Sequence, residues 1–475
     1  MIDANEEHEL LTAFAECRLD LQINNIEVRV GQRLVLRAER GRLYSTPQKK
    51  LLLEFQAAPV PVSFPMDPLG SYEGFIVNAT ADEDWLISTT LFLITPIAYH
   101  KIEMMVDWRS ETWEVILQRN NNSNLVGLEY LGLVDKLECL FENGTVRETK
   151  SGRNKDALDW LELQTAGVNV QVHQGENTWS YVTVQMGQHY EISRFGSEVS
   201  ATLNAISLRM GKRTEAFAAH WKSSKSEQLC LSGFHYSRPT HSGNAPMIPL
   251  ILRDNQGSNF IALAKEYFLK QADSKIMSTL CALWDAELVS RENHRLQIAI
   301  AVESLSTYIN KLHRKSAQTE ANKARKTEEK TFSELKDKAL KLLAPLAGKP
   351  GHITRLKNVI ARTALNDAGP RIQDAGERLG LTFCAEEIQL WRAMRNPAAH
   401  GDQREFEPHE NDFFACQSML YRMILAMIGW TGPRNHFGPF DPKPVRKAFT
   451  EPITHSFNLN DIDGLRRVEK QDGSN

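Results

Sequence analysis

An arginine and a histidine five positions apart, Arg395 and His400, are the residues of this chain best suited to chemistry. Arginine presents a planar, permanently charged fork that matches phosphate oxygens. Histidine titrates near neutrality and can move protons on and off oxygen. RNA carries its own nucleophile, the 2′-hydroxyl, so such a pair can cleave a phosphodiester through proton transfer and charge stabilisation alone. The gap between the two residues is uncharged and small, which leaves room for a nucleic-acid backbone.

A short amphipathic helix is predicted immediately before this pair. Ile388 and Trp391 fall at the spacing of one helix face. Pro397 disfavours helical backbone at the residue before it, so we expect the helix to stop near Arg395. The chain reversal that follows would bring the guanidinium of Arg395 and the imidazole of His400 together at one helix end.

Each residue of the pair also has a structural alternative. Arg395 can cap the carbonyl groups of its own helix, because cations favour that end. His400 can form a loop contact with Asp402. Asn396 can orient a phosphate or His400, but an asparagine before proline is also a common turn opener.

Nearby basic residues leave further alternatives open. Arg392 lies three residues before Arg395, hence on the same helix face. It can hold an adjacent phosphate, or it can pair with Glu387 or Glu386. A second Arg-x4-His match begins at Arg404, but two glutamates in its gap would repel a phosphate. We interpret that second match as a solvated loop.

The elements that must position the pair divide the chain into unlike halves. We predict an α+β fold in which a β-rich N-terminal domain precedes an all-α bundle. The predicted parts are a sensing or regulatory domain over 1–230, a linker over 231–257, a helical domain over 258–430 and an irregular tail over 431–475. Glycine and proline are frequent in the linker, and proline is frequent in the tail.

Hydrophobic periodicity supports this division. Apolar residues alternate with polar ones on both sides of Gly31 and Gln32, which predicts a β-hairpin. Ile298, Val302, Leu305 and Ile309 form one stripe of a long helix. The charged run over 311–341 favours an exposed helix or crossover, with an RNA-holding surface as the alternative.

Composition and motifs exclude several classes. The 475 residues carry a formal net charge of −3, so there is no overall basic footprint for nucleic acid. The 14 histidines and 6 cysteines form no cluster with metal-ligand spacing, and no glycine-rich phosphate loop is present. The acidic start lacks the features of a secretion signal, and no segment suits a membrane span. We therefore expect a cytoplasmic protein without membrane contact, metal or cofactor.

The segment from Arg395 to His400 resembles the Arg-x4–6-His motif of HEPN domains, which carry a polar residue directly after the arginine. Predicted helices before the motif and the apolar helix from Phe413 to Trp430 agree with such a bundle. A β-rich first half joined to this bundle is similar to the ApeA-type HEPN proteins of bacterial antiphage defence.

This resemblance implies a metal-independent endoribonuclease that acts as a homodimer through the helical domain. Arg395 would bind the scissile phosphate, His400 would act as general acid and base, and Asn396 would orient one of them. Arg392 would contact RNA, and the products would be a 2′,3′-cyclic phosphate and a 5′-hydroxyl. Expected partners are RNA, with tRNA as one candidate, and a phage-derived trigger of abortive infection. The alternative is a non-catalytic HEPN-type dimerisation or binding scaffold.

Overall fold

The structure is a computed structural model of the whole chain, and it separates into two compact units. The first unit contains residues 1–244 and 250–272, and the second contains 245–249 and 273–475. The residues described are 5–30, 32–47, 50–58, 75–81, 85–91, 95–100, 105–120, 127–137, 160–165, 168–174, 179–187, 192–232, 247–248, 256–271, 275–287, 291–316, 321–343, 368–400 and 410–435.

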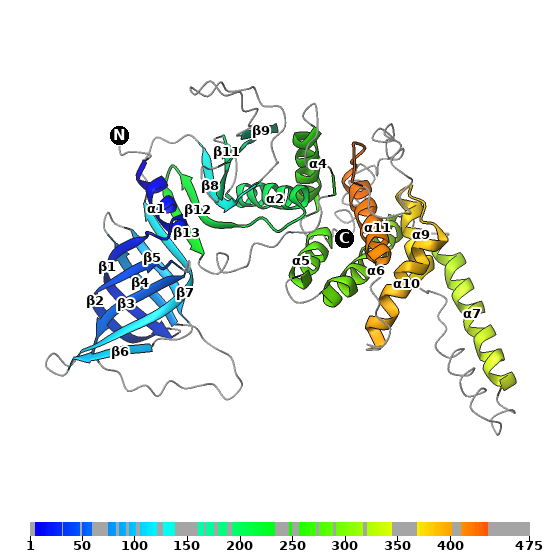
Figure 1. Cartoon of the computed structure of the whole chain (residues 1–475), viewed down its shortest axis with the longest axis horizontal. Coiled ribbons are helices and arrows are strands. Elements are labelled where there is room, and N and C mark those ends of the chain that lie inside the picture. The colour runs from blue at the N-terminus through cyan, green and yellow to red at the C-terminus, as the bar shows by residue number, and fades with distance from the viewer. Residues whose placement is uncertain are drawn as a thin grey trace, which may run out of the picture. The chain divides into compact units, whose positions relative to one another are not determined.

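Six antiparallel strands of the first unit close into a barrel (Figure 1). They are β1 (Asp20–Val30), β2 (Arg33–Ser45), β3 (Leu51–Ala57), β4 (Phe75–Ala81), β5 (Leu86–Leu91) and β7 (Met105–Asn120). The order is β3-β2-β1-β4-β5-β7, and β7 pairs back with β3 to complete the ring. Helix α1 (Asn5–Ala15) contributes Leu11 and Phe14 to the barrel core. Strand β6 (Thr95–His100) pairs with β7 outside the ring.

The predicted hairpin is confirmed as the β1–β2 pair. Ile26 lies opposite Ala38, and Val28 lies opposite Leu36. All four side chains are buried, because alternate residues of a strand point to the same face. Leu34, in contrast, is 41 % exposed, so the buried face does not extend to the start of β2.

The sheet continues beyond the barrel from β7 through six further strands. In pairing order they are β13 (Ser226–Ser232), β12 (Ala216–Ser223), β8 (Leu128–Asp135), β11 (Trp179–Met186), β10 (Val168–Gln174) and β9 (Trp160–Thr165). Helix α2 (Ile192–Met210) packs on this part, where the ring of Phe195 meets Trp221 edge to face at 5.6 Å. Gly211 follows α2 with a φ of 69°, a left-handed conformation that suits glycine at a helix end.

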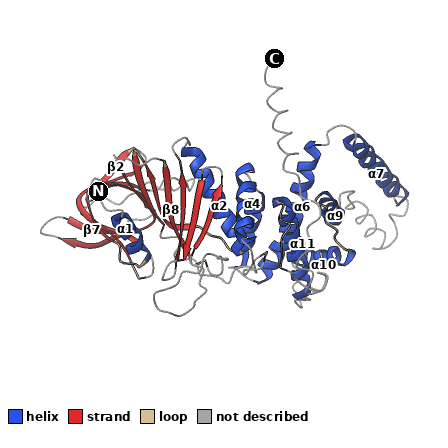
Figure 2. Cartoon of the chain, turned by 90° about the horizontal axis from the view of Figure 1, so that it is seen from above, coloured by secondary structure: helices blue, strands red, loops and turns tan. Residues whose placement is uncertain are grey.

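Helix α4 (Gln256–Lys270) belongs to the first unit, although the sequence analysis placed it in the helical domain starting at 258. It packs beside α2 (Figure 2). Lys265 of α4 and Glu198 of α2 form an ion pair at 2.8 Å, with side chains 2 % and 6 % exposed. A buried charge requires a partner, and the partner of Lys265 lies in the first unit.

The described helices of the second unit include one long helix against which four others pack. They are α5 (Lys275–Glu287), α6 (Arg291–Ser316), α7 (Ala321–Leu343), α9 (Ala368–Arg378), α10 (Ala385–His400) and α11 (Glu410–Ile428). Helix α6 contacts α5, α9, α10 and α11. Its predicted apolar stripe is confirmed, since Ile298, Val302, Leu305 and Ile309 are at most 1 % exposed.

The remaining predictions for this half concern α11 and the charged run. Helix α11 is buried along most of its length, as predicted for Phe413 to Trp430. The charged run is helical over α7, and most of the described side chains of α7 are exposed, including Leu335 at 58 % and Leu342 at 76 %. Within the described residues, no helix is both long and apolar enough to cross a membrane. The chain is therefore α+β, with strands in its first half and helices in its second.

Candidate active site

Helix α10 carries all four residues singled out in the sequence, and it runs unbroken from Ala385 to His400. The prediction that the helix stops near Arg395 is therefore wrong. Pro397 removes one backbone donor and only biases the preceding residue against helix. That bias is outweighed here, where Trp391 and Met394, within the two turns before Pro397, are buried and hold α10 in place.

The continuous helix changes how Arg395 and His400 are related. Five residues of α-helix advance the backbone by about 7.5 Å and turn it through about 500°, so the two positions face directions about 140° apart. No chain reversal brings the pair together at a helix end. The side chains of Asn396 and His400 lie outside the described part of the structure, as do Asp402 and the second match from Arg404 to His409.

The start of α10 is held by a reciprocal capping box. The backbone amide of Cys384 donates to Oε2 of Glu387 at 2.8 Å, and the amide of Glu387 donates to Sγ of Cys384 at 3.4 Å. Glu387 is buried, and its other oxygen accepts a hydrogen bond from Arg422 of α11. This carboxylate therefore fixes both the beginning of α10 and its packing on α11.

Two side chains one turn apart join α10 to α6. The indole of Trp391 donates to the carbonyl of Ala299 at 2.9 Å. Nε of Arg395 donates to Oε2 of Glu303 at 2.8 Å, and its guanidinium carbon lies 6.0 Å from the centroid of the Trp391 ring. The described hydrogen bond of Arg395 thus goes to a neighbouring helix rather than to carbonyls of α10. Its side chain is 37 % exposed, so it remains accessible to a ligand.

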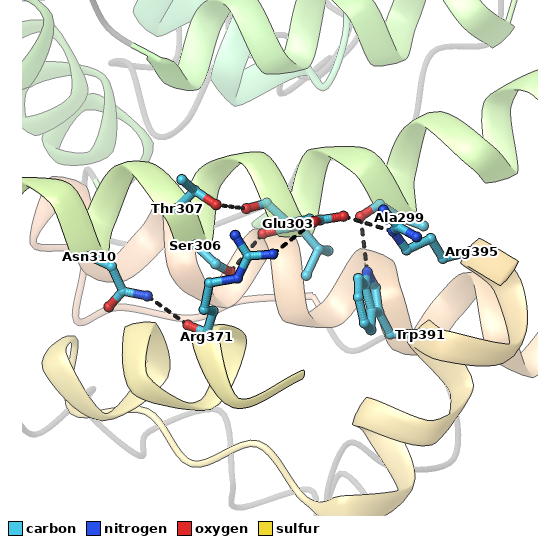
Figure 3. A network of polar contacts seen from close by, with 9 residues as sticks. Ala299, Glu303, Ser306, Thr307, Asn310, Arg371, Trp391 and Arg395 are labelled. Atoms are coloured by element: carbon cyan, nitrogen blue, oxygen red, sulfur yellow. Dashed lines mark hydrogen bonds and ion pairs between the residues drawn. The ribbon is translucent and has the colours of Figure 1, made fainter. Parts of the chain in front are cut away.

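Glu303 also binds a second arginine, Arg371 of α9 (Figure 3). Nη2 of Arg371 donates to Oε1 of Glu303 at 3.1 Å, so each oxygen of this carboxylate receives one guanidinium. The amide of Asn310 donates to the backbone carbonyl of Arg371 at 2.8 Å, which anchors α9 on α6. Two guanidinium groups and one carboxylate leave a formal charge of +1, which favours binding of an anion.

Arg392 lies against the same helix α9. A Cβ added at Gly369 would come within 2.5 Å of Nη2 of Arg392, so this guanidinium lies close against the backbone of α9 at Gly369. Three arginines from α9 and α10, Arg371, Arg392 and Arg395, therefore belong to the region where these helices meet. Chemically, this arrangement can bind phosphate oxygens.

Sequence reasoning missed Glu303 and Arg371. A signal for Glu303 was present, because it follows Val302, a member of the apolar stripe of α6, by one position. Ser306 and Asn310 repeat this relationship to the stripe, which marks a second, polar line at helical spacing. No comparable signal singles out Arg371, whose role depends on the packing of α9.

Histidine chemistry in the described part of the second unit is limited. His294 of α6 lies 5.1 Å from the ring of Phe413, and burial lowers its pKa to about 4. Its imidazole is therefore neutral at pH 7. Among the described residues, no group of three or more histidine, cysteine or acidic side chains could hold a metal ion. Comparison with protein-family models, curated proteins and solved structures gives no match for this chain.

Proposed function

We propose that the chain is a metal-independent endoribonuclease of the HEPN type, with Arg395 and His400 as its catalytic residues. The observation that carries this proposal is the environment of Arg395. Its guanidinium is partly exposed and shares a single carboxylate with a second arginine, on the same helix that ends at His400. A phosphate can therefore approach a cationic group whose position is already set.

The proposed reaction uses the RNA 2′-hydroxyl as nucleophile. His400 removes its proton and returns a proton to the leaving 5′-oxygen. Arg395 stabilises the extra negative charge that the phosphate gains in the transition state. Asn396 orients the phosphate or the imidazole, and Arg392 binds an adjacent phosphate. The products are a 2′,3′-cyclic phosphate and a 5′-hydroxyl.

A homodimer through the helical domain suits this chemistry. Within one chain, the positions of Arg395 and His400 on α10 face about 140° apart. A cleft shared by two copies can supply the arginine from one helix and the histidine from the other. We propose that the first unit senses a trigger, of phage origin in antiphage defence, and restrains cleavage of RNA such as tRNA until then.

A second candidate is a non-catalytic HEPN-type scaffold. The ion pair between Arg395 and Glu303 favours it, because the pair joins α10 to α6 and gives Arg395 a structural task. In this alternative the bundle supplies only dimerisation or binding.

The test uses the purified full chain, end-labelled RNA and excess EDTA. Cleavage that survives EDTA, leaves cyclic phosphate ends and disappears in His400→Ala and Arg395→Ala supports the nuclease. His409→Ala is the matched control and should cleave like the wild type. RNA that stays intact under every condition, with growth of expressing cells unaffected by either substitution, supports the scaffold.

A further inference from the structure

We infer that Arg371 is a further phosphate-binding residue of the proposed nuclease site, and that Glu303 occupies Arg371 and Arg395 until RNA displaces it. This inference rests on the proposed function, because it extends the same site. Neither residue is part of the Arg-x4-His segment, and α9 and α6 lie apart from that segment in the sequence. They are brought to it only by the packing of α9, α6 and α10 (Figure 3).

The hydrogen-bonding capacity of the two guanidinium groups supports this role. A guanidinium carries five N–H donors. Arg395 uses Nε towards Glu303 and Arg371 uses Nη2, and within the described residues these are the side-chain hydrogen bonds of both groups. Nε of Arg371 is buried without a hydrogen-bond partner there. Arg371 and Arg395 therefore have N–H donors that Glu303 does not use. A phosphate has more acceptor oxygens than one carboxylate and can bind to these donors.

The carboxylate of Glu303 binds the two arginines in the way that a phosphate would. Carboxylate and phosphate both present paired oxygens to an arginine fork. Glu303 is 23 % exposed, and Arg371 and Arg395 are 29 % and 37 % exposed, so an incoming phosphate can reach all three side chains. A phosphate that replaces the carboxylate of Glu303 would contact the guanidinium groups of both Arg371 and Arg395, whereas a site with Arg395 alone would offer it one cation.

Arg371 is positioned for this purpose by its backbone. Asn310, only 4 % exposed, donates to the carbonyl of Arg371 at 2.8 Å. Ile372 and Ala375 of the same helix are fully buried, which fixes the helix face that carries them. A side chain that starts from a fixed backbone loses less entropy when it binds a ligand. Gly369, two residues earlier, lies next to the guanidinium of Arg392. Helix α9 therefore carries Arg371 and also contacts Arg392.

The experiment measures binding of a 2′-O-methyl RNA oligonucleotide to the full chain across a range of salt concentrations. This probe has no free 2′-hydroxyl, so the proposed reaction cannot consume it. We expect Arg371→Ala to weaken binding about tenfold and to reduce the slope of log affinity against log salt by about one. Arg371→Lys should keep the slope. Glu303→Gln should tighten binding several-fold, because the competing charge is gone.

Arg378→Ala is the matched control, since Arg378 is an exposed arginine of the same helix. An Arg371→Ala variant with wild-type affinity and slope overturns the inference, and so does a Glu303→Gln variant that binds RNA more weakly. If Arg371→Ala does not fold, the Arg371→Lys and Glu303→Gln variants test the inference. Arg371→Lys should then keep the salt slope, and Glu303→Gln should bind RNA more tightly.

Cleavage of unmodified RNA separates this inference from the proposed function. Wild-type cleavage with unchanged binding by Arg371→Ala rejects the inference alone. Binding that depends on Arg371, without cleavage, rejects the nuclease alone. A wild-type chain that neither binds the probe nor cleaves unmodified RNA rejects both.

Discussion

Glu303 of α6 accepts a hydrogen bond from Nε of Arg395 of α10 at 2.8 Å, across 92 residues of sequence. The other oxygen of the same carboxylate binds Arg371 of α9. One acidic side chain therefore holds three helices of the second unit together and sets the position of the proposed catalytic arginine. Stability and ligand binding are expected to respond in opposite directions when this carboxylate is changed.

Replacement of Glu303 by glutamine should destabilise the second unit while it improves RNA binding. The pair is partly exposed, so its loss should cost about 1–2 kcal/mol, between the values for surface and buried pairs. Urea unfolding of the variant and the wild type measures this cost. Glu377→Gln on the exposed side of α9 is the control and should change neither property. A Glu303→Gln variant as stable as the wild type would argue against the bridging role.

Replacement of Lys265 should destabilise the first unit, because Lys265 forms a buried ion pair with Glu198. Lys265→Met leaves the carboxylate of Glu198 buried without its ion-pair partner, which typically costs about 3–5 kcal/mol. The double variant Lys265→Met with Glu198→Leu should recover most of that loss, because no charge then stays buried. Hydrogen exchange of the α2 and α4 amides reports the change locally. A double variant no more stable than the single one contradicts this prediction.

Acid should weaken the first unit through His220. The side chain is 8 % exposed, and burial lowers its pKa from 6.5 to about 4. The unfolded chain therefore binds a proton between pH 6.5 and 4 that the folded chain does not. Stability is full above about pH 6.5 and falls towards pH 4, by up to about 3 kcal/mol. Urea unfolding measured at each pH would show this fall.

The control for that prediction is His220→Leu, which should flatten the pH dependence of the first unit. His294 titrates over the same range, so the second unit should keep its own acid sensitivity in this variant. Burial raises the pKa of Glu227, but hydrogen bonds from Lys222 and Arg119 outweigh this effect, so the pKa is lowered overall. This carboxylate therefore loses its charge only at lower pH. An unchanged pH profile in His220→Leu would contradict the assignment.

Serine in place of Cys384 should stabilise α10. A hydroxyl is a stronger acceptor than a thiol for the backbone amide of Glu387, and serine is a preferred N-cap residue. The expected gain is about 0.5–1 kcal/mol. Thermal unfolding should show a higher midpoint for Cys384→Ser than for the wild type, and a lower one for Cys384→Ala. The reverse order would mean that the thiol does not cap this helix.

The sequence by itself determined the features that depend on local periodicity. The alternation around Ile26 and Leu36 predicted a hairpin, because each strand places alternate residues on one face. The stripe from Ile298 to Ile309 predicted the buried face of α6 for the same kind of reason. The change from strands in the first half to helices in the second was likewise predicted from the sequence.

Tertiary structure alone decided the features that depend on partners far away in the sequence. Packing kept α10 helical past Pro397, against the local preference of the residue before it. Burial of Lys265 beside Glu198 assigned α4 to the first unit. The contacts of Glu303 with Arg371 and Arg395 span 68 and 92 residues, and no local pattern encodes which charges will meet once helices pack.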